Sequence, residues 1–490
     1  MPAPASETRL DTTSDTRFFG HPRGLSTLFF TEMWERFGFY GVRAILVYFM
    51  TATLAQGGLG FSTAKAGIIY GMFLAMVYLL SLPGGWLADN ILGQQRSVLY
   101  GGIVIAIGWF IMALPGEAPF YTALTLVTFG TGMLKPNVST IVGGLYSPGD
   151  KRRDAGFSIF YMGINVGALI SPLICGYVGE KINYRWGLAL AGVGMTAGLI
   201  QYSLGTKYLG KAGLPPPVNP QARRQALLGA VTIVILAGVV AALASAGVIH
   251  ITPDNLSDAV GLFLTVLTLL VFGWLLKGAN WTSAERGKLA AIIVFFIASA
   301  LFWSAFEQAG STLSLFAQRN TRLSIFGWDF PASWFQSLNS IFLVIMAPVF
   351  AAMWIKMGKR EPSTTTKFAW GLIFVGLGFA VLIPVANQTG VSPMWLTLTY
   401  FLHTIGELSL SPVGLSAMTK LAPQRIGALV MGIWFLSISV GEFIGGRVAA
   451  VYEKFPLSLI FGAVAGFSIV VGLLLFTLVR PVSRMTGDVN

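Results

Sequence analysis

The stretch Thr31-Glu32-Met33-Trp34-Glu35-Arg36-Phe37-Gly38-Phe39-Tyr40-Gly41-Val42-Arg43 places four charged side chains inside a hydrophobic run from about residue 26 to residue 54. The run is long enough to cross a bilayer as a helix, which needs roughly 20 residues. Each charge would cost about 2.5–3.5 kcal/mol at mid-membrane on insertion scales. At about 100° per residue, the charges and Tyr40 fall within an arc of roughly 140°. The stretch therefore predicts a transmembrane helix whose charged face lines a polar cavity.

The composition is that of a membrane protein. Hydrophobic residues make up 54% of the 490 residues and charged residues only 11%, whereas a soluble protein would carry roughly 25% charged residues. The net charge of +12 could suggest nucleic-acid binding, but the basic residues are spread among connecting segments. The preference of Lys and Arg for cytoplasmic loops explains them better. We therefore expect a polytopic membrane protein that does not bind nucleic acid.

The apolar runs and helix breakers predict an all-α polytopic membrane protein with about 14 transmembrane helices. A hydrophilic segment with Pro215-Pro216-Pro217 follows the first six, because a triple proline cannot continue a helix. Two Ala/Val/Leu-rich spans at about 226–276 come next, with ionisable residues only at their ends and in their loop, and these spans are expected to face lipid. Six more spans complete a 6 + 2 + 6 plan, the architecture of the major facilitator transporters.

With both termini in the cytoplasm, about 22 Lys and Arg fall on the cytoplasmic side and about 7 on the other, which fixes the orientation. The predicted boundaries are a cytoplasmic tail at 1–24, a six-helix bundle at 25–210, a linker with two inserted helices at 211–284, a second six-helix bundle at 285–480 and a cytoplasmic tail at 481–490. Residues 1–23 are polar, so no cleavable signal peptide is expected. Cys175 is the single cysteine, which excludes an intrachain disulfide and favours a small buried hydrophobe.

The loop between the second and third spans is Gly84-Gly85-Trp86-Leu87-Ala88-Asp89-Asn90-Ile91-Leu92-Gly93-Gln94-Gln95-Arg96, which resembles the cytoplasmic loop motif of the major facilitator superfamily. Its glycines permit a tight turn between helices. Asp89 is placed to cap the N-terminus of a helix, that of span eleven, and so to brace one closed state. A simple solvated turn is the alternative. Asp89 and Arg96 are therefore the candidate conformational residues.

The fourth and fifth spans carry polar residues that apolar packing does not require. Lys135 lies in a segment with glycines and a proline, which loosen the helix and permit close approach by neighbours. Snorkelling to the membrane interface is the alternative for this lysine. Tyr161 and Asn165, four residues apart on a Gly-rich helix, offer hydrogen bonds on one face.

Two carboxylates lie in the middle of later spans. Glu307 follows Trp303 by one turn, and Glu407 has His403 and Ser411 one turn to either side. A structural ion pair between the two halves is the alternative for either carboxylate, and a pair that breaks on protonation is itself a switch.

Two other ionisable residues are given structural interpretations. Glu442 has Arg447 five residues away, which favours a structural role. His403 taken alone is interpreted as a satisfied core histidine.

The distribution of these charges indicates a kind of solute. The first half presents Arg36, Arg43 and Lys135, and the second half presents Glu307 and Glu407. A cavity that is positive on one wall and negative on the other suits a zwitterion with separated charges, and buried carboxylates can take up protons near neutral pH. The residues alone thus predict a proton-coupled transporter of a small dipolar solute, and they leave the solute open.

Several of these motifs together resemble the proton-coupled oligopeptide transporters, the POT or PTR family, of bacterial type. Residues 32–41 are similar to the ExxERFxYY signature of that family. The loop at 84–96 and the stretch at 157–168 resemble two other signatures, and residues 303–308 and 406–412 resemble the patterns of helices 7 and 10. The resemblance covers nearly the whole chain, and the inserted helix pair is typical of bacterial members.

The resemblance implies roles for individual residues. The expected proton-coupling residues are Glu32, Glu35, Arg36, Lys135 and Glu307. The expected peptide-binding residues are Arg43 at the carboxylate, Glu407 at the amino terminus, and Tyr40, Tyr78, Lys135, Tyr161, Asn165, Trp303, Asn339, Ser411 and Trp434 around them. Arg43 is expected to exchange partners with Glu307. Phe39 replaces the first tyrosine of the signature, and the second span lacks the coupling histidine of animal members, so coupling rests on carboxylates.

These observations favour import of di- and tripeptides driven by protons, by alternating access, across the inner membrane of a bacterium. A carrier of nitrate or another small solute is the alternative, although a lone anion has no use for Glu407. A membrane-embedded enzyme fits poorly, because three histidines and one cysteine form no evident metal-ligand cluster. A channel also fits poorly, since the charges are split between two halves. No cofactor besides the coupling proton is expected, and a monomer is the default.

Overall fold

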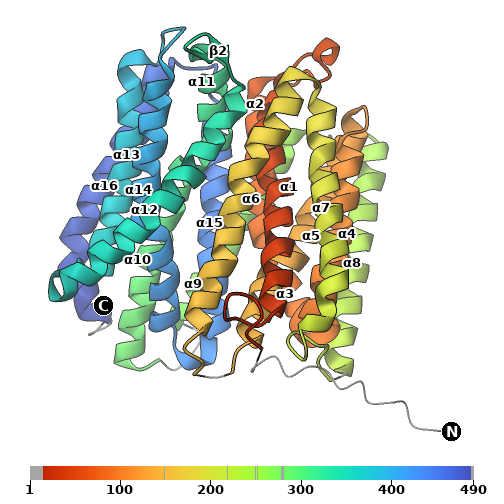
Figure 1. Cartoon of the computed structure of the whole chain (residues 1–490), viewed down its shortest axis with the longest axis vertical. Helices are drawn as coiled ribbons and strands as arrows, with labels where there is room; N and C mark the ends of the chain where they lie inside the picture. The colour runs from red at the N-terminus through yellow and green to blue at the C-terminus, as the bar shows by residue number, and fades with distance from the viewer. Residues whose placement is uncertain are drawn as a thin grey trace. The chain divides into compact units, whose positions relative to one another are not determined.

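The computed structural model describes residues 15–147, 149–217, 219–248, 250, 252–277 and 281–486, and these residues are almost entirely helical (Figure 1). The predicted tails at 1–24 and 481–490 lie partly outside the described residues. The helices of the first part of the chain are α1 (Gly24–Thr51), α2 (Thr63–Leu79), α3 (Ser81–Leu87), α4 (Gln94–Met112), α5 (Glu117–Gly144), α6 (Arg153–Lys181), α7 (Tyr184–Gly205) and α8 (Pro220–Ser245). The later helices are α9 (Pro253–Lys277), α10 (Ser283–Phe306), α11 (Thr312–Asn320), α12 (Phe335–Met357), α13 (Thr364–Leu382), α14 (Pro393–Leu421), α15 (Gly427–Ala449) and α16 (Leu457–Thr486).

Many of these helices are long enough to cross a membrane. Within the described residues, ten helical segments are long and apolar enough to cross a membrane. The predicted number of 14 stays a prediction. Among the described residues, two short strands, β1 (Ser324–Ile325) and β2 (Trp328–Asp329), form an antiparallel hairpin. Its two turn residues both have positive φ, which is the backbone of the tightest hairpin turns.

The chain divides into two compact units, each built from several segments. Unit 1 comprises residues 1–42, 80–175 and 185–251, and unit 2 comprises 43–79, 176–184 and 252–490. α1 thus contributes its first part to unit 1 and its last part to unit 2. The predicted domain boundaries at 25–210, 211–284 and 285–480 follow the order of the chain and stay a prediction.

Unit 1 is built around antiparallel helix packing. α4 and α5 lie side by side along most of their length (Figure 1). The chain enters α4 through the π-helical turn Ala88–Leu92 and then Gly93, whose φ of +76° is a left-handed conformation that favours glycine. The tight helix-to-helix turn predicted for the loop at 84–96 is therefore present.

Unit 2 has an aromatic core. α13 packs between α14 and α16, α10 packs against α15, and α2 also packs on α15. The rings of Phe302 and Phe306 stack in the middle of this core, and those of Phe379 and Phe461 pack nearby. Burial of each such side chain contributes about 1.5–3 kcal/mol in water, but in a membrane close packing is the main gain. The core therefore fixes the helices that carry the buried carboxylates of this unit.

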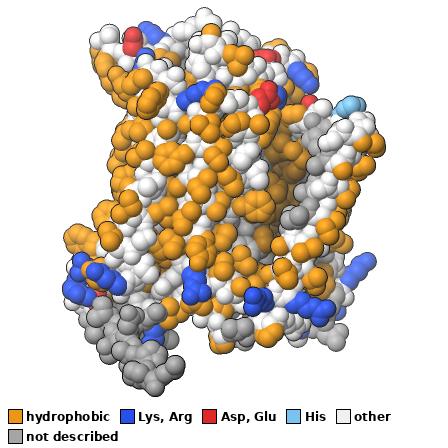
Figure 2. Space-filling view, turned by 90° about the vertical axis from the view of Figure 1, so that its right-hand side faces the viewer, with side chains coloured by type: hydrophobic (Ala, Val, Ile, Leu, Met, Phe, Trp, Pro, Cys, Tyr) orange, Lys and Arg blue, Asp and Glu red, His pale blue; other side chains and the backbone are white. Residues whose placement is uncertain are grey.

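The outer surfaces match a bilayer environment. The face in Figure 2 carries a broad band of hydrophobic side chains, with Lys and Arg gathered at its lower edge. α8 and α9 expose large apolar residues along their length, such as Ile235 at 58% and Leu269 at 67%. Among the described residues, Asp258 of α9 forms an ion pair with Arg447 of α15 at 3.1 Å. These surfaces support the prediction that the inserted helices face lipid.

Candidate functional site

The first buried charge cluster lies in unit 1 on α1. Arg36 Nε forms ion pairs with Glu32 Oε1 at 3.0 Å and with Glu35 Oε2. All three side chains are at most 4% exposed. Glu32 precedes Arg36 by four residues, so the helix itself sets this ion pair. Lys135 of α5 also interacts electrostatically with Glu32. Four of the five predicted proton-coupling residues are therefore brought together in one cluster.

A glycine on α6 holds this part of α1 in place. A Cβ added at Gly167 would collide with the carbonyl oxygen of Met33 and lie 3.0 Å from Cβ of Arg36. Only glycine allows so close an approach of α6 to the backbone of α1. The stretch at 157–168 thus has a packing role. The sequence had suggested only a hydrogen-bonding role for it, based on its asparagine. That asparagine, Asn165, is 6% exposed and donates to the carbonyl of Tyr161 at 2.9 Å.

The remaining predicted binding residues of unit 1 differ in exposure. Tyr40 and Lys135 are half-buried, and the Tyr161 side chain is 48% exposed. Tyr40 lies one turn after Arg36 on α1. These side chains reach the surface of unit 1, as residues that meet a solute must.

The second buried charge cluster lies in unit 2, where α10 ends. Arg43 Nη2 forms an ion pair with Glu307 Oε2 at 2.5 Å, and Arg43 Nε donates to the hydroxyl of Tyr70 at 3.0 Å. Arg43 and Glu307 are 8% and 5% exposed. Glu307 opens the 3-10 turn Glu307–Gly310, which interrupts the helix between α10 and α11. Such breaks in membrane helices are where transporters place ion and substrate sites.

Glu407 of α14 belongs to the same neighbourhood. It interacts electrostatically with Glu307 and Arg43. Asn339 Nδ2 donates to Glu407 Oε2 at 2.9 Å and to the hydroxyl of Thr404 at 3.1 Å. The cluster therefore contains one guanidinium, that of Arg43, and two carboxylates. The carboxylate of Glu407 accepts a hydrogen bond from the neutral amide of Asn339. This excess of negative charge leaves room for a proton or for the ammonium group of a ligand.

The aromatic and polar residues predicted around Glu407 are also in unit 2. Trp303 and Trp434 are 7% and 3% exposed, and Tyr78 and Ser411 are half-buried. His403 is buried between the rings of Phe306 and Phe379. This burial supports the interpretation of His403 as a core residue. Neither ring nitrogen has a hydrogen-bond partner among the described residues, so the structure does not support the prediction that the histidine is satisfied.

The loop residues predicted to have conformational roles lie in unit 1. Asp89 Oδ1 accepts a hydrogen bond from Gln94 Nε2 at 2.7 Å, within the loop itself. Arg96 is exposed at the start of α4. Capping of span eleven by Asp89 stays a prediction.

Sequence reasoning missed two groups that contact the predicted residues and one half-buried carboxylate elsewhere in unit 2. Tyr70 bonds Arg43, and it precedes the predicted Tyr78 by two turns on α2, a spacing that could have revealed it. Thr404 shares the amide of Asn339 with Glu407, and its position three residues before Glu407 was the available signal. Glu180, at the end of α6, accepts hydrogen bonds from the backbone N–H groups of Ala332 and Ser333, and no sequence pattern pointed to it.

A third polar cluster in unit 2 lies at the ends of helices. Glu453 Oε1, in the turn after α15, accepts from the hydroxyl of Thr63 at 2.5 Å and forms an ion pair with Arg319 Nη1 at 2.8 Å. Arg319 Nη2 also donates to the Thr63 hydroxyl at 3.0 Å. The hydrogen bonds from Thr63 and then Arg319 lower the pKa of Glu453. The cluster ties the start of α2 to α11 and to the turn before α16.

One buried acid–base cluster inside a long apolar helix and a second at the break of another are typical of ion-coupled membrane transporters, and they define the class of this protein. A family model described as the POT family matches residues 95–470. The chain is 44% identical to the "Uncharacterized transporter YclF" of Bacillus subtilis over 472 residues, covering 95% of each chain. It is 38% identical to a "Di-/tripeptide transporter" of Lactococcus lactis over 496 residues, covering 97% of this chain and 99% of the relative.

A solved structure agrees with these relatives. The structure of a peptide transporter POT in complex with sulfate superimposes with a TM-score of 0.92 at 43% identity, covering 97% of this chain and 98% of that one. This chain belongs to the POT family. Its fold is that of the major facilitator transporters, as the sequence predicted.

Proposed function

We propose that this protein is a symporter that imports di- and tripeptides together with protons by alternating access. The observation that carries the proposal is the buried Arg43–Glu307 ion pair at the break of α10, with Glu407 in electrostatic contact. The relatives named as peptide transporters support this solute class.

The chemistry of the solute follows from the two carboxylates. A short peptide carries a carboxylate and an ammonium group separated by its backbone. Arg43 meets the carboxylate, and Glu407, whose partner Asn339 is neutral, takes the ammonium group. Nitrate has no ammonium group and would leave Glu407 without a function, so the peptide is favoured over a small anion.

Proton coupling follows from the ion pair. When Glu307 takes up a proton, its attraction for Arg43 falls, and Arg43 becomes available to the peptide. The charge network then rearranges and access alternates between the two sides. The membrane potential assists inward movement by about 2.3 kcal/mol per charge per 100 mV. Glu32, Glu35, Arg36 and Lys135 form a second set of groups that take part in coupling.

The proposal includes the setting of the protein. We place it in the inner membrane of a bacterium, as a multi-pass monomer with both termini in the cytoplasm. The proton is the coupling ion and no other cofactor is required. The protein has no catalytic role.

The test uses purified protein in proteoliposomes with radiolabelled dialanine. An imposed inward proton gradient drives uptake by the native protein. Glu307→Gln abolishes gradient-driven uptake and preserves counterflow exchange of dialanine, because a neutral side chain mimics the protonated state. Nitrate uptake serves as the control for the alternative solute. Gradient-driven dialanine uptake at the native rate in Glu307→Gln would show that Glu307 is not the proton site.

A further inference from the structure

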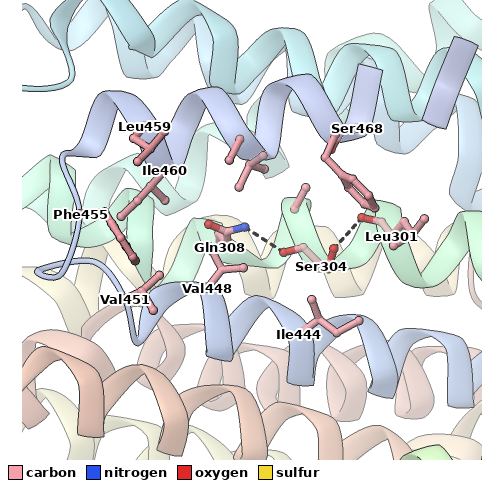
Figure 3. Close-up of a pocket in the computed structure, with 14 residues that line it drawn as sticks. Leu301, Ser304, Gln308, Ile444, Val448, Val451, Phe455, Leu459, Ile460 and Ser468 are labelled. Carbon is pink, nitrogen blue, oxygen red and sulfur yellow. Dashed lines mark hydrogen bonds between the residues drawn. The ribbon is translucent and has the colours of Figure 1, made fainter. Parts of the chain in front are cut away.

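A groove on unit 2 begins where α10 ends, and neither Arg43, Glu307 nor Glu407 is among its lining residues. It is enclosed by α10, α15 and α16, and its volume is about 820 Å³ (Figure 3). Apolar side chains form nearly all of its lining, and no charged side chain takes part. Its outer wall includes Leu459 and Phe467, which are 57% and 56% exposed. In a bilayer this wall meets the acyl chains of lipids.

One polar side chain in the groove lacks part of its hydrogen bonding. Gln308 is 1% exposed, and its amide lies between Val448 of α15 and Ile460 of α16 (Figure 3). Its Nε2 donates to the carbonyl of Ser304 at 3.1 Å, and Ser304 Oγ donates to the carbonyl of Leu301 at 2.8 Å. The Oε1 atom of Gln308 accepts no hydrogen bond from any described residue. A buried acceptor without a donor carries a free-energy penalty that a bound donor would remove.

We propose that this groove binds an uncharged glyceride, a diacylglycerol, whose free hydroxyl donates to Gln308 Oε1. The acyl chains then lie along the apolar walls and leave the groove toward the membrane. A volume of about 820 Å³ is within the usual range of small-molecule pockets.

Other classes of occupant match the groove less well. A deprotonated fatty acid and a phosphate diester have no proton to donate and would bring a negative charge into a lining without cations. A peptide would bring two charges. The hydroxyl of a glyceride satisfies the single acceptor and adds no charge.

The experiment measures lipid binding to the full-length protein by native mass spectrometry. The two probes are dioleoylglycerol and its O-methyl ether, which has the same acyl chains and no hydroxyl donor. The native protein is expected to bind one dioleoylglycerol about fivefold to tenfold more tightly than the ether. Gln308→Leu is expected to lower dioleoylglycerol binding to the level of the ether and to leave binding of the ether unchanged.

Two tryptophan variants test the location. Ala463 lines the groove, and Ala463→Trp is expected to fill it and abolish binding of both probes. Val470 is on the same helix, is 54% exposed and does not line the groove, so Val470→Trp should bind both probes normally. This pair remains informative if Gln308→Leu fails to fold.

Three outcomes would overturn the proposal. Equal binding of the two probes by the native protein would exclude the hydroxyl contact. Retained dioleoylglycerol binding in Ala463→Trp would exclude this groove. Displacement of dioleoylglycerol by equimolar dioleoylphosphatidylglycerol would identify a phospholipid as the occupant.

Discussion

Two arginines on α1, Arg36 and Arg43, lie about two turns apart and are held in different ways. Arg36 is paired with Glu32 and Glu35 of its own helix. Arg43 is paired with Glu307, far along the chain, and with the hydroxyl of Tyr70 on α2. One cluster is therefore local and the other depends on tertiary structure.

The difference separates a charge network with two ion pairs inside one helix from a network with one ion pair between distant segments of the chain. Protonation of Glu32 leaves Arg36 its ion pair with Glu35, so the local cluster keeps a buried counter-charge. Protonation of Glu307 removes the negative charge from its ion pair with Arg43. A switch needs two states of similar free energy, and in the proposed mechanism the protonation of Glu307 separates them.

The largest expected effect comes from removing the guanidinium of the local cluster. Arg36→Met leaves two buried carboxylates without it, and breaking a buried ion pair in this way costs about 3–5 kcal/mol. Arg43→Met breaks one ion pair, that with Glu307, whereas Arg36→Met breaks two, so the loss of stability in Arg43→Met should be smaller. Thermal unfolding followed by tryptophan fluorescence in detergent measures both.

A combined variant is the control for this comparison. Arg36→Met with Glu32→Gln and Glu35→Gln removes the uncompensated charge and should recover most of the thermal stability without restoring gradient-driven uptake. A melting temperature for Arg43→Met as low as that of Arg36→Met, or lower, would contradict the distinction between the two clusters.

A smaller effect, on peptide binding, is expected at Glu407, the residue of the second cluster that is proposed to bind the peptide ammonium group. Glu407→Gln loses a charge-assisted contact to the peptide ammonium group, which contributes about 1.5–3 kcal/mol, or roughly a 10- to 150-fold higher KM for dialanine. The rise should occur in gradient-driven uptake and in counterflow alike, whereas Glu307→Gln affects only the former. Asn339→Ala removes a group that positions Glu407 and should raise KM less.

A modified substrate sharpens this prediction. N-acetyl-dialanine has no ammonium group, so the native protein should discriminate strongly against it and Glu407→Gln should lose most of that discrimination. Equal discrimination in the two proteins would place the ammonium group elsewhere.

The local cluster could be predicted from the sequence because helical periodicity alone brings its members together. Glu32, Glu35 and Arg36 share a face of any helix formed by residues 31–43, and their charges in an apolar run indicate a buried function. The major facilitator fold could also be predicted from local features of the sequence, namely the apolar runs, the triple proline and the loop at 84–96.

The long-range cluster could be predicted only in part. Glu307 and Glu407 stood out as carboxylates within apolar spans, and the family resemblance named Arg43 as a partner. The pairing with Tyr70, the break of the helix at Glu307 and the role of Gly167 depend on which helices pack together, and residue spacing does not encode that packing. The family resemblance implied roles for individual residues, but the contacts between those residues could be seen only in the structure.

The smallest expected effect contrasts the buried clusters with the Thr63–Arg319–Glu453 cluster. The Glu453 side chain is 56% exposed, and an ion pair at such a site contributes about 0–1 kcal/mol. Hydrogen bonds from Thr63 and Arg319 lower the pKa of Glu453, so the folded state binds fewer protons than the unfolded state at mildly acidic pH. The stabilisation is therefore complete above the unfolded carboxyl pKa of about 4.3 and is lost as the pH falls through the lowered value.

Glu453→Gln should accordingly lower the melting temperature slightly at pH 7, and the difference from the native protein should shrink as the solution is acidified below pH of about 4. Salt gives a second readout, because about 1 M NaCl shortens the screening length to about 3 Å and should remove the Glu453 effect. The loss caused by Arg36→Met should persist in the same salt, since water and ions do not reach a side chain that is 3% exposed. If both effects vanished together in salt, the buried cluster would have to be open to solvent, and the contrast between the buried clusters and the exposed one would fail.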